Sequence, residues 1–155
     1  MTYPAIGTKA PEFTALDQNS KEVKLSDFKG EYVCLYFYPK ALTPGCMIQA
    51  AGIRQDIREF EENNIKVLGV SPDLPERLKK FEQKQGLNFT LLSDPEHKMA
   101  EMYGTWVKKK MFNKEYFGFE RTTFIIGKDG EVFDILSKVK PKEHVEKVLK
   151  SILDK

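Results

Sequence analysis

Apolar residues along the chain fall into short continuous runs and into helically spaced stripes. The clearest run is residues 32–38, YVCLYFY, which is apolar throughout, as expected for a strand covered on both faces. Directly after it, apolar residues recur at spacings of three and four from Cys46 to Phe60. This spacing predicts an amphipathic helix that ends at Asn63 and Asn64.

The same patterns place the other elements. Runs bounded by turn residues predict two N-terminal strands that form a hairpin. These two strands are expected at residues 12–16 and 22–25. A helix is predicted at 75–85, because Pro75 suits the first helical position and Gly86 follows the last. Further strands are expected at residues 65–70, 89–92, 122–126 and 131–136, the last two as a second hairpin, and further helices from 94 to 103 and at 141–153. This order predicts an α/β fold, with a mixed central sheet flanked by helices on both faces.

Composition and charge narrow the class of protein. A chain of 155 residues with 41% hydrophobic residues is expected to form one domain over residues 1–155. The formal charge of +2 argues against nucleic-acid and membrane-surface partners, and the longest uncharged apolar run is too short to span a bilayer. The first residues lack the pattern of a secretion signal, and two cysteines do not make a disulfide scaffold. We therefore expect a cytoplasmic protein.

Cys46 is the candidate for chemistry, because it follows Thr-Pro-Gly at the predicted start of a helix and beyond the end of the 32–38 strand. Free N–H groups and the helix dipole favour a thiolate there, and a nearby arginine would favour it further. Thr43 is a candidate N-cap, whose hydroxyl could accept a backbone N–H and donate to the sulfur or the substrate. Pro39 and Pro44 stiffen the loop. The helical stripe directs Cys46 inward.

The alternative for either cysteine is a buried structural role. The Thr-Pro-Gly-Cys context favours a reactive Cys46, whereas Cys34 lies in the middle of the 32–38 strand and is expected in the core. At ~3.3 Å per strand residue, roughly 15 Å separate Cys34 from the end of the strand near Cys46. Because a disulfide needs Cα atoms within ~7 Å, we expect no bridge between the two thiols.

The segment YFYPKALTPGC holds Pro39, Thr43 and Cys46 in a Pro-x-x-x-Thr-x-x-Cys arrangement that resembles the peroxiredoxin active site. The segments GTKAPEF, LSDFKG, VLGVSPD, NFTLLSDPEH and RTTFIIGKDGEV resemble the bacterioferritin comigratory protein, or peroxiredoxin Q, group. The resemblance covers nearly the whole chain in order. It implies a thioredoxin-like fold and an antioxidant peroxidase that uses thiols to reduce hydrogen peroxide and organic hydroperoxides.

The resemblance also implies roles for four residues. Cys46 matches the peroxidatic cysteine, and Thr43 matches the threonine that hydrogen-bonds the thiolate and the peroxide. Pro39 matches the proline that shields the site, and Arg121 matches the arginine beside the sulfur. The alternative for Arg121 is an ordinary surface ion pair.

Ala51 departs from the family pattern, because many members carry a resolving cysteine at this position, five residues after the peroxidatic one. The predicted helix at 75–85, another resolving position in the group, also lacks cysteine. Ala51 is compatible with a member that naturally lacks the second thiol and with one whose resolving cysteine has been replaced. The chain therefore resembles a one-cysteine peroxiredoxin, with a Cys46 sulfenic acid reduced by thioredoxin, glutaredoxin or glutathione. The group is often monomeric, and we expect a monomer.

Other candidate sites give weaker signals. We expect no metal or organic cofactor, because His97 and His144 are isolated and are taken as surface residues. Residues 108–110, three lysines, are expected in a solvated loop that a small anionic reductant could use, with Trp106 packing nearby or at the rim of the site. Two rival functions share the fold. A thiol–disulfide oxidoreductase would need a Cys-x-x-Cys motif, and Gln49 occupies the position of its second cysteine. A holdase chaperone would not need Thr43, Cys46 and Arg121 together.

Overall fold

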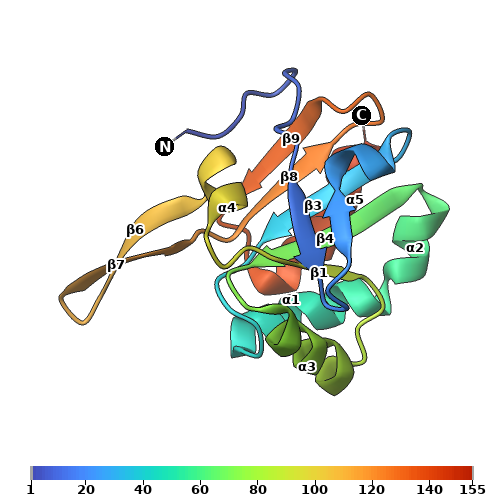
Figure 1. The fold of residues 1–155 in the computed structure, drawn as a ribbon. Helices are drawn as coiled ribbons and strands as arrows, with labels where there is room; N and C mark the ends of the chain where they lie inside the picture. Colours follow the sequence, from blue (N-terminus) through green and yellow to red (C-terminus); the bar gives the residue numbers. More distant parts are fainter. Residues whose placement is uncertain (1, 155) are drawn as a thin grey trace.

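A seven-stranded mixed sheet forms the centre of the computed structural model, which describes residues 2–154 (Figure 1). The order across the sheet is β2-β1-β5-β4-β3-β8-β9. Strand β3 pairs in parallel with β4, which pairs in parallel with β5, and the other neighbours are antiparallel. The strands are β1 (Thr14–Asp17), β2 (Glu22–Lys24), β3 (Tyr32–Phe37), β4 (Ile65–Ser71), β5 (Thr90–Ser93), β8 (Thr122–Ile126) and β9 (Val132–Ser137). The predicted mixed sheet and N-terminal hairpin are confirmed.

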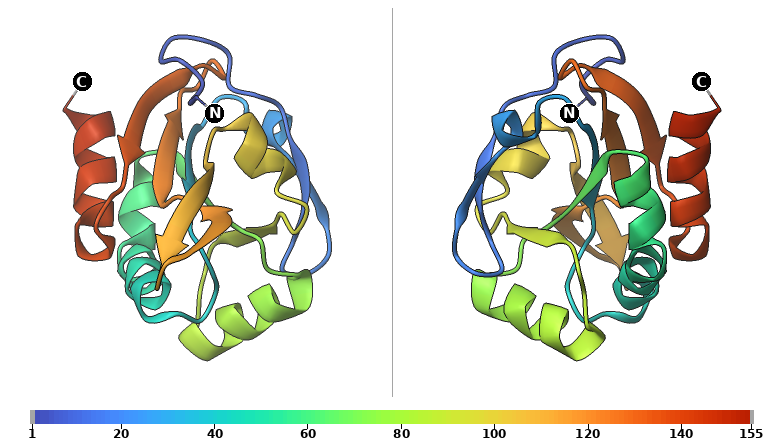
Figure 2. Two further views of the ribbon diagram at one scale, coloured as in Figure 1. Left: turned by 90° about the vertical axis from the view of Figure 1, so that its left-hand side faces the viewer. Right: turned by 90° about the vertical axis from the view of Figure 1, so that its right-hand side faces the viewer.

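Alternate residues of the strands face two separate cores. Cys34 and Tyr36 of β3 lie in one core with residues of α1, α2, α3 and α5, whereas Leu35 and Phe37 lie in the other with residues of α4 and the N-terminal segment. Figure 2 shows α1, α2 and α5 together on one side of the sheet. The helices are α1 (Pro44–Gln55), α2 (Ile57–Glu62), α3 (Pro75–Gln85), α4 (Lys98–Met102) and α5 (His144–Leu153). Helices therefore cover both faces, as predicted.

Three helices begin or end differently from the prediction. The helix expected from 94 to 103 is the shorter α4, which begins at Lys98. The helix expected from Cys46 to Asn63 is divided at Asp56, whose backbone departs from helical geometry with a ψ of 16°. The last helix is preceded by a 3-10 turn over Pro141–Glu143. The apolar spacing continues from Ile53 to Ile57 across the break at Asp56, so it could not reveal that break.

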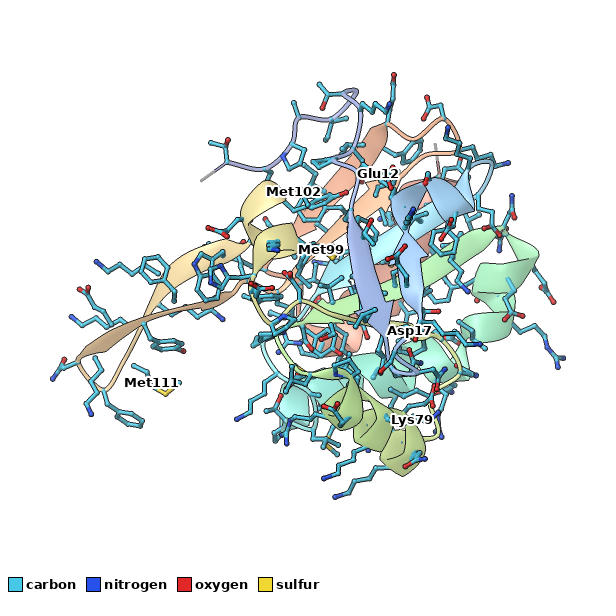
Figure 3. All side chains as sticks on the ribbon, viewed as in Figure 1. Glu12, Asp17, Lys79, Met99, Met102 and Met111 are labelled. Carbon is cyan, nitrogen blue, oxygen red and sulfur yellow. The ribbon has the colours of Figure 1, made fainter. Side chains whose placement is uncertain are left out.

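A two-stranded sheet that the sequence analysis did not predict consists of β6 (Trp106–Met111) paired with β7 (Lys114–Phe119). The expectation of a solvated loop at residues 108–110 is wrong, because these lysines lie within β6. The two-residue turn at Phe112 and Asn113 has φ values of 51° and 63°, which suits a tight hairpin although no glycine marks it. The hairpin projects from the body of the molecule (Figure 1), with Met111 near its tip (Figure 3).

No helix among the described residues is both long enough and apolar enough to cross a membrane.

Candidate active site

Strand pairing brings Arg121 to the start of α1. Cys46 lies in the first turn of α1, which follows the carboxyl end of β3. Strand β8 runs antiparallel to β3 with Phe37 opposite Thr122, so Arg121 stands beside the end of β3. Its Nη1 lies 3.5 Å from the sulfur of Cys46. The topology thus joins two residues that the chain separates widely.

The first turn of α1 presents backbone donors near this sulfur. The N–H of Met47 donates to the carbonyl of Thr43 (2.8 Å), so the N–H groups of Gly45 and Cys46 precede the intrahelical hydrogen bonds. A Cβ at Gly45 would lie 3.1 Å from Nη2 of Arg121, so glycine leaves the guanidinium its room. Cys46 is only 1% exposed. The thiol therefore sits in a shielded position between a guanidinium and a helix N-terminus.

Gln49 holds the guanidinium from the next turn of the same helix. Its Oε1 accepts a hydrogen bond of 2.7 Å from Nη1 of Arg121, and its side chain is buried. The same nitrogen that faces Cys46 is thus fixed by a second partner. The sequence analysis noted Gln49 only because it occupies the position of the second cysteine in a Cys-x-x-Cys motif.

The loop before α1 is held by side chains that the sequence analysis did not select. The N–H of Ala41 donates to Oδ2 of Asp73 (2.7 Å), and Nη2 of Arg77 donates to the carbonyl of Ala41 (3.2 Å). Arg77 also pairs with Oδ1 of Asp73 (3.1 Å), and Ser71 donates to Oδ2 (2.8 Å). We call Asp73 and Arg77 the loop clamp. Both backbone polar groups of the buried Ala41, its N–H and its carbonyl, are therefore hydrogen-bonded by the loop clamp, which fixes the path of the chain into α1.

Thr43 and Pro39 lie on this loop. Thr43 is the N-cap residue by position, but its side chain makes no capping hydrogen bond and instead donates to the carbonyl of Lys40 (2.8 Å). In this structure the Thr43 hydroxyl donates to the loop rather than to the sulfur, and donation to a substrate stays a prediction. Pro39 is half-buried at the bend that follows β3.

His144 is not a surface residue, contrary to the prediction. It is 1% exposed, and its Nε2 lies 2.7 Å from Oγ1 of Thr123, two residues beyond Arg121. Burial, with a smaller contribution from the positive charge of Arg121, lowers the pKa of His144 to about 3. The error arose because an isolated histidine carries no sequence signal of burial. His97 does lie at the surface, where its ring stacks on Trp106 at 3.9 Å.

Cys34 lies in the core, as expected. It is fully buried, and burial raises its pKa to about 12. Neither Cys34 nor Cys46 forms a disulfide. Among residues 2–154, no three His, Cys, Asp or Glu side chains come together as a metal site.

Comparisons with known proteins agree with this fold. Residues 6–135 match the sequence model of the AhpC/TSA family. The chain belongs to this family. It is 46% identical over 145 residues to the putative peroxiredoxin bcp of Haemophilus influenzae, covering 94% of each chain. It is also 46% identical over 149 residues to peroxiredoxin Bcp of Bacillus subtilis, covering 96% of this chain and 95% of that one.

Two solved structures extend the likeness of this AhpC/TSA chain. A PrxQ mutant of Xylella fastidiosa superimposes with a TM-score of 0.93 at 30% identity, covering 99% of this chain and 98% of that one. The bacterioferritin comigratory protein of Xanthomonas campestris, described through its alkyl peroxide reduction activity, gives 0.90 at 28% identity, covering 97% and 98%. The predicted group and the thioredoxin-like peroxiredoxin fold are confirmed. This AhpC/TSA chain is a thiol-dependent peroxidase.

Proposed function

We propose that Cys46 is the peroxidatic nucleophile and that Arg121, Thr43 and Pro39 complete its site. The observation that carries the proposal is the contact of 3.5 Å between Nη1 of Arg121 and the buried sulfur at the start of α1. A cation and free N–H groups around one sulfur favour the thiolate, which is the reactive form.

In the proposed reaction, the thiolate attacks the terminal oxygen of ROOH and the O–O bond breaks. The sulfur is oxidised to sulfenic acid, while RO⁻ leaves and takes a proton to become ROH. Arg121 and the helix N–H groups stabilise the negative charge as it passes from sulfur to the leaving oxygen. Because the Thr43 hydroxyl donates its hydrogen bond to the backbone carbonyl of Lys40, its oxygen can accept a hydrogen bond from the O–H of the peroxide. Pro39 shields the entrance.

Hydrogen peroxide and organic hydroperoxides are the proposed substrates. The 1% exposure of Cys46 favours small or slender molecules, since a bulky group cannot approach the sulfur closely. The alkyl peroxide reduction described for the Xanthomonas campestris relative supports the inclusion of organic hydroperoxides.

The sulfenic acid is reduced by an external thiol. Ala51 and the helix α3 provide no second cysteine, and Cys34 is buried with a raised pKa. A thiol therefore condenses with Cys46–SOH and releases water, and a second thiol displaces Cys46 as a disulfide forms. Thioredoxin, glutaredoxin and glutathione are the candidate reductants. We place this activity in a cytoplasmic, monomeric, single-domain protein without nucleic-acid or membrane partners.

Peroxide consumption with dithiothreitol as the reductant tests the proposal. The unaltered protein should consume peroxide catalytically, and intact mass after one equivalent of peroxide without thiol should show one added oxygen at Cys46. Catalytic consumption that survives Cys46→Ser would overturn the assignment. The rival oxidoreductase is disfavoured by Gln49, which occupies the second motif position and binds Arg121.

A further inference from the structure

Lys109 is the one lysine of the β6 run that turns toward the body of the molecule. Its neighbours Lys108 and Lys110 are exposed, and Lys108 pairs with Glu115 at 2.7 Å. Lys109 is half-buried, and its Nζ reaches back to donate to the carbonyl of Phe119 (2.5 Å). Its stem passes over Gly118, where a Cβ would lie 3.5 Å from Cδ of the lysine. The ammonium is thus directed to the segment that leads into Arg121.

This ammonium has a cationic neighbour and no carboxylate partner. Among residues 2–154, Lys109 forms no ion pair. The carboxylate of Glu120 is engaged by the hydroxyls of Tyr3 and Thr122. Burial and the positive charge of Arg121 lower the pKa of Lys109, while the negative charges of Glu120 and Cys46 oppose them. Lys109 therefore contacts the carboxyl end of β7, two residues before Arg121, whose Nη1 lies 3.5 Å from the sulfur of Cys46.

Lys109 and Arg121 thus have two anions near them, the carboxylate of Glu120 and, in the proposed reactive state, the thiolate of Cys46. Placing two positive charges close together in a partly buried region is unfavourable unless an anion offsets them. Oxidation of the thiolate to a neutral sulfenic acid removes this anion, so the site becomes more positive by one charge. This gain of positive charge occurs in the sulfenic acid state, which is the state that a thiol has to reduce.

We propose that Lys109 and Arg121 attract anionic thiols to oxidised Cys46, so that the preferred reductant is a small thiol bearing carboxylates. This inference rests on the proposed function and adds the chemical class of the reductant. Lys109 acts as an anion-binding residue at the rim, where it holds a carboxylate of the incoming thiol.

The chemistry is balanced with two thiols per turnover. The thiolate of the first, R′S⁻, attacks the sulfur of Cys46–SOH, the S–O bond breaks, and hydroxide leaves and takes a proton to become water. The mixed disulfide is then attacked by the thiolate of a second R′SH. Cys46 leaves as a thiolate, and R′SSR′ is the oxidised product.

Three small thiols of similar length provide the probe: 3-mercaptopropionate is anionic, 2-mercaptoethanol neutral and cysteamine cationic. The protein is oxidised with one equivalent of hydrogen peroxide, and the loss of sulfenic acid is followed by quenched intact mass at equal thiolate concentrations. At low salt the anionic thiol should react about three- to tenfold faster than the neutral one, and the cationic one slower still. The differences should shrink at high ionic strength.

Variants of the hairpin assign the effect. Lys109→Met should remove most of the preference for the anionic thiol while leaving the rate with 2-mercaptoethanol nearly unchanged. Lys109→Arg should retain the preference, because it retains the charge. Lys110→Met is the matched control, since it removes one charge from the adjacent, exposed position of the same strand and should leave the preference intact.

The outcomes separate this inference from the proposed function. If Cys46 is oxidised by peroxide but the three thiols react equally, the inference fails and the proposed function stands. Equal loss of preference in Lys109→Met and Lys110→Met would mean that only the general charge of the hairpin acts, and it would also overturn the assignment. If peroxide does not oxidise Cys46, the proposed function itself fails.

Discussion

Burial does not distinguish the two cysteines, because Cys34 is 0% and Cys46 1% exposed. Their surroundings do. Cys34 is enclosed by the core, and burial raises its pKa to about 12, which suppresses the thiolate. Cys46 has the guanidinium of Arg121 at 3.5 Å and lies at a helix start. The neighbouring charge and the free N–H groups are therefore the basis on which we propose Cys46 as the reactive thiol.

Serine substitutions test this contrast directly. Cys46→Ser should abolish dithiothreitol-dependent peroxide consumption, whereas Cys34→Ser should retain most of it, because the core thiol takes no part in the proposed reaction. Consumption of hydrogen peroxide is the measurement, with circular dichroism to establish that both variants fold. Equal losses in two folded variants would contradict the assignment.

Arg121 is expected to govern the reactivity of Cys46. Arg121→Ala should slow peroxide attack by about 10²-fold, the magnitude seen when one donor to a developing anion is removed. It should also slow the alkylation of Cys46 by iodoacetamide. Arg54→Ala is a control, since Arg54 lies on α1 but donates to the carbonyl of Gln85. An alkylation profile that Arg121→Ala leaves unchanged would count against the role.

Sequence reasoning found Cys46 and Arg121 through the resemblance of local segments, each of which is continuous in the chain. It missed Gln49 and Asp73, which act through contacts between distant residues. The bond from Arg121 to Gln49 spans 72 positions, and that from Ala41 to Asp73 spans 32. Neither residue type carries a local signal of such a role.

At the scale of elements, the loop before α1 contains one strained backbone position, which hydrogen bonds from the loop clamp stabilise. Leu42 has a φ of 65°, a left-handed conformation that a leucine adopts at a cost of about 1 kcal/mol or more. The loop clamp of Asp73 and Arg77 fixes Ala41 directly before it. The start of α1 is therefore an element whose conformation depends on a few polar contacts.

A cysteine in place of Ala51 tests how readily this element opens. Positions 46 and 51 lie on one helix, separated by a rise of ~7.5 Å and a rotation of about 140°, so a disulfide requires local unwinding. Ala51→Cys should nevertheless form an intramolecular disulfide after one equivalent of peroxide, seen by intact mass as the loss of two hydrogens. It should also resist oxidation to sulfinic acid.

Adding Asp73→Asn to Ala51→Cys should speed the formation of this disulfide, because the loop clamp is weakened. Lys79→Met, on the same helix as Arg77 but outside the clamp, is the control. If the single Ala51→Cys variant accumulates sulfinic acid as fast as the parent, the helix does not open in time.

Element boundaries were predicted best where residues such as proline and glycine mark both ends of the element. The helix α3 runs over the predicted residues, with a proline at its first position and Gly86 in the left-handed conformation after its last. The β6–β7 hairpin was missed because its turn, Phe112 and Asn113, lacks glycine, and because three lysines hide the alternation of the strand. The break at Asp56 was missed because apolar spacing continues on both sides of it.

For the whole molecule, His144 links stability to pH. Its pKa is about 3 in the folded protein against an ordinary value of 6.5, so the unfolded chain binds a proton that the folded chain excludes. The free energy of unfolding should therefore fall as the pH drops below 6.5, by ~1.4 kcal/mol per unit until the pH nears the folded pKa.

Urea denaturation between pH 7 and 5 measures this dependence. His144→Gln should flatten it by about 2 kcal/mol at pH 5, because glutamine takes up no proton. His97→Gln serves as the exposed control. An identical pH dependence in the unaltered protein and in His144→Gln would show that another group is responsible.

The sheet order has a consequence for the protein during its synthesis. Arg121 lies 75 positions after Cys46, and it reaches the sulfur only when β8 pairs with β3. At 5–20 residues per second, a ribosome takes roughly 4–15 s to add that stretch. Through this interval the nascent chain carries Cys46 without its arginine partner. On the proposed role of Arg121, newly made protein should respond to peroxide only after β8 has been synthesised and has paired with β3.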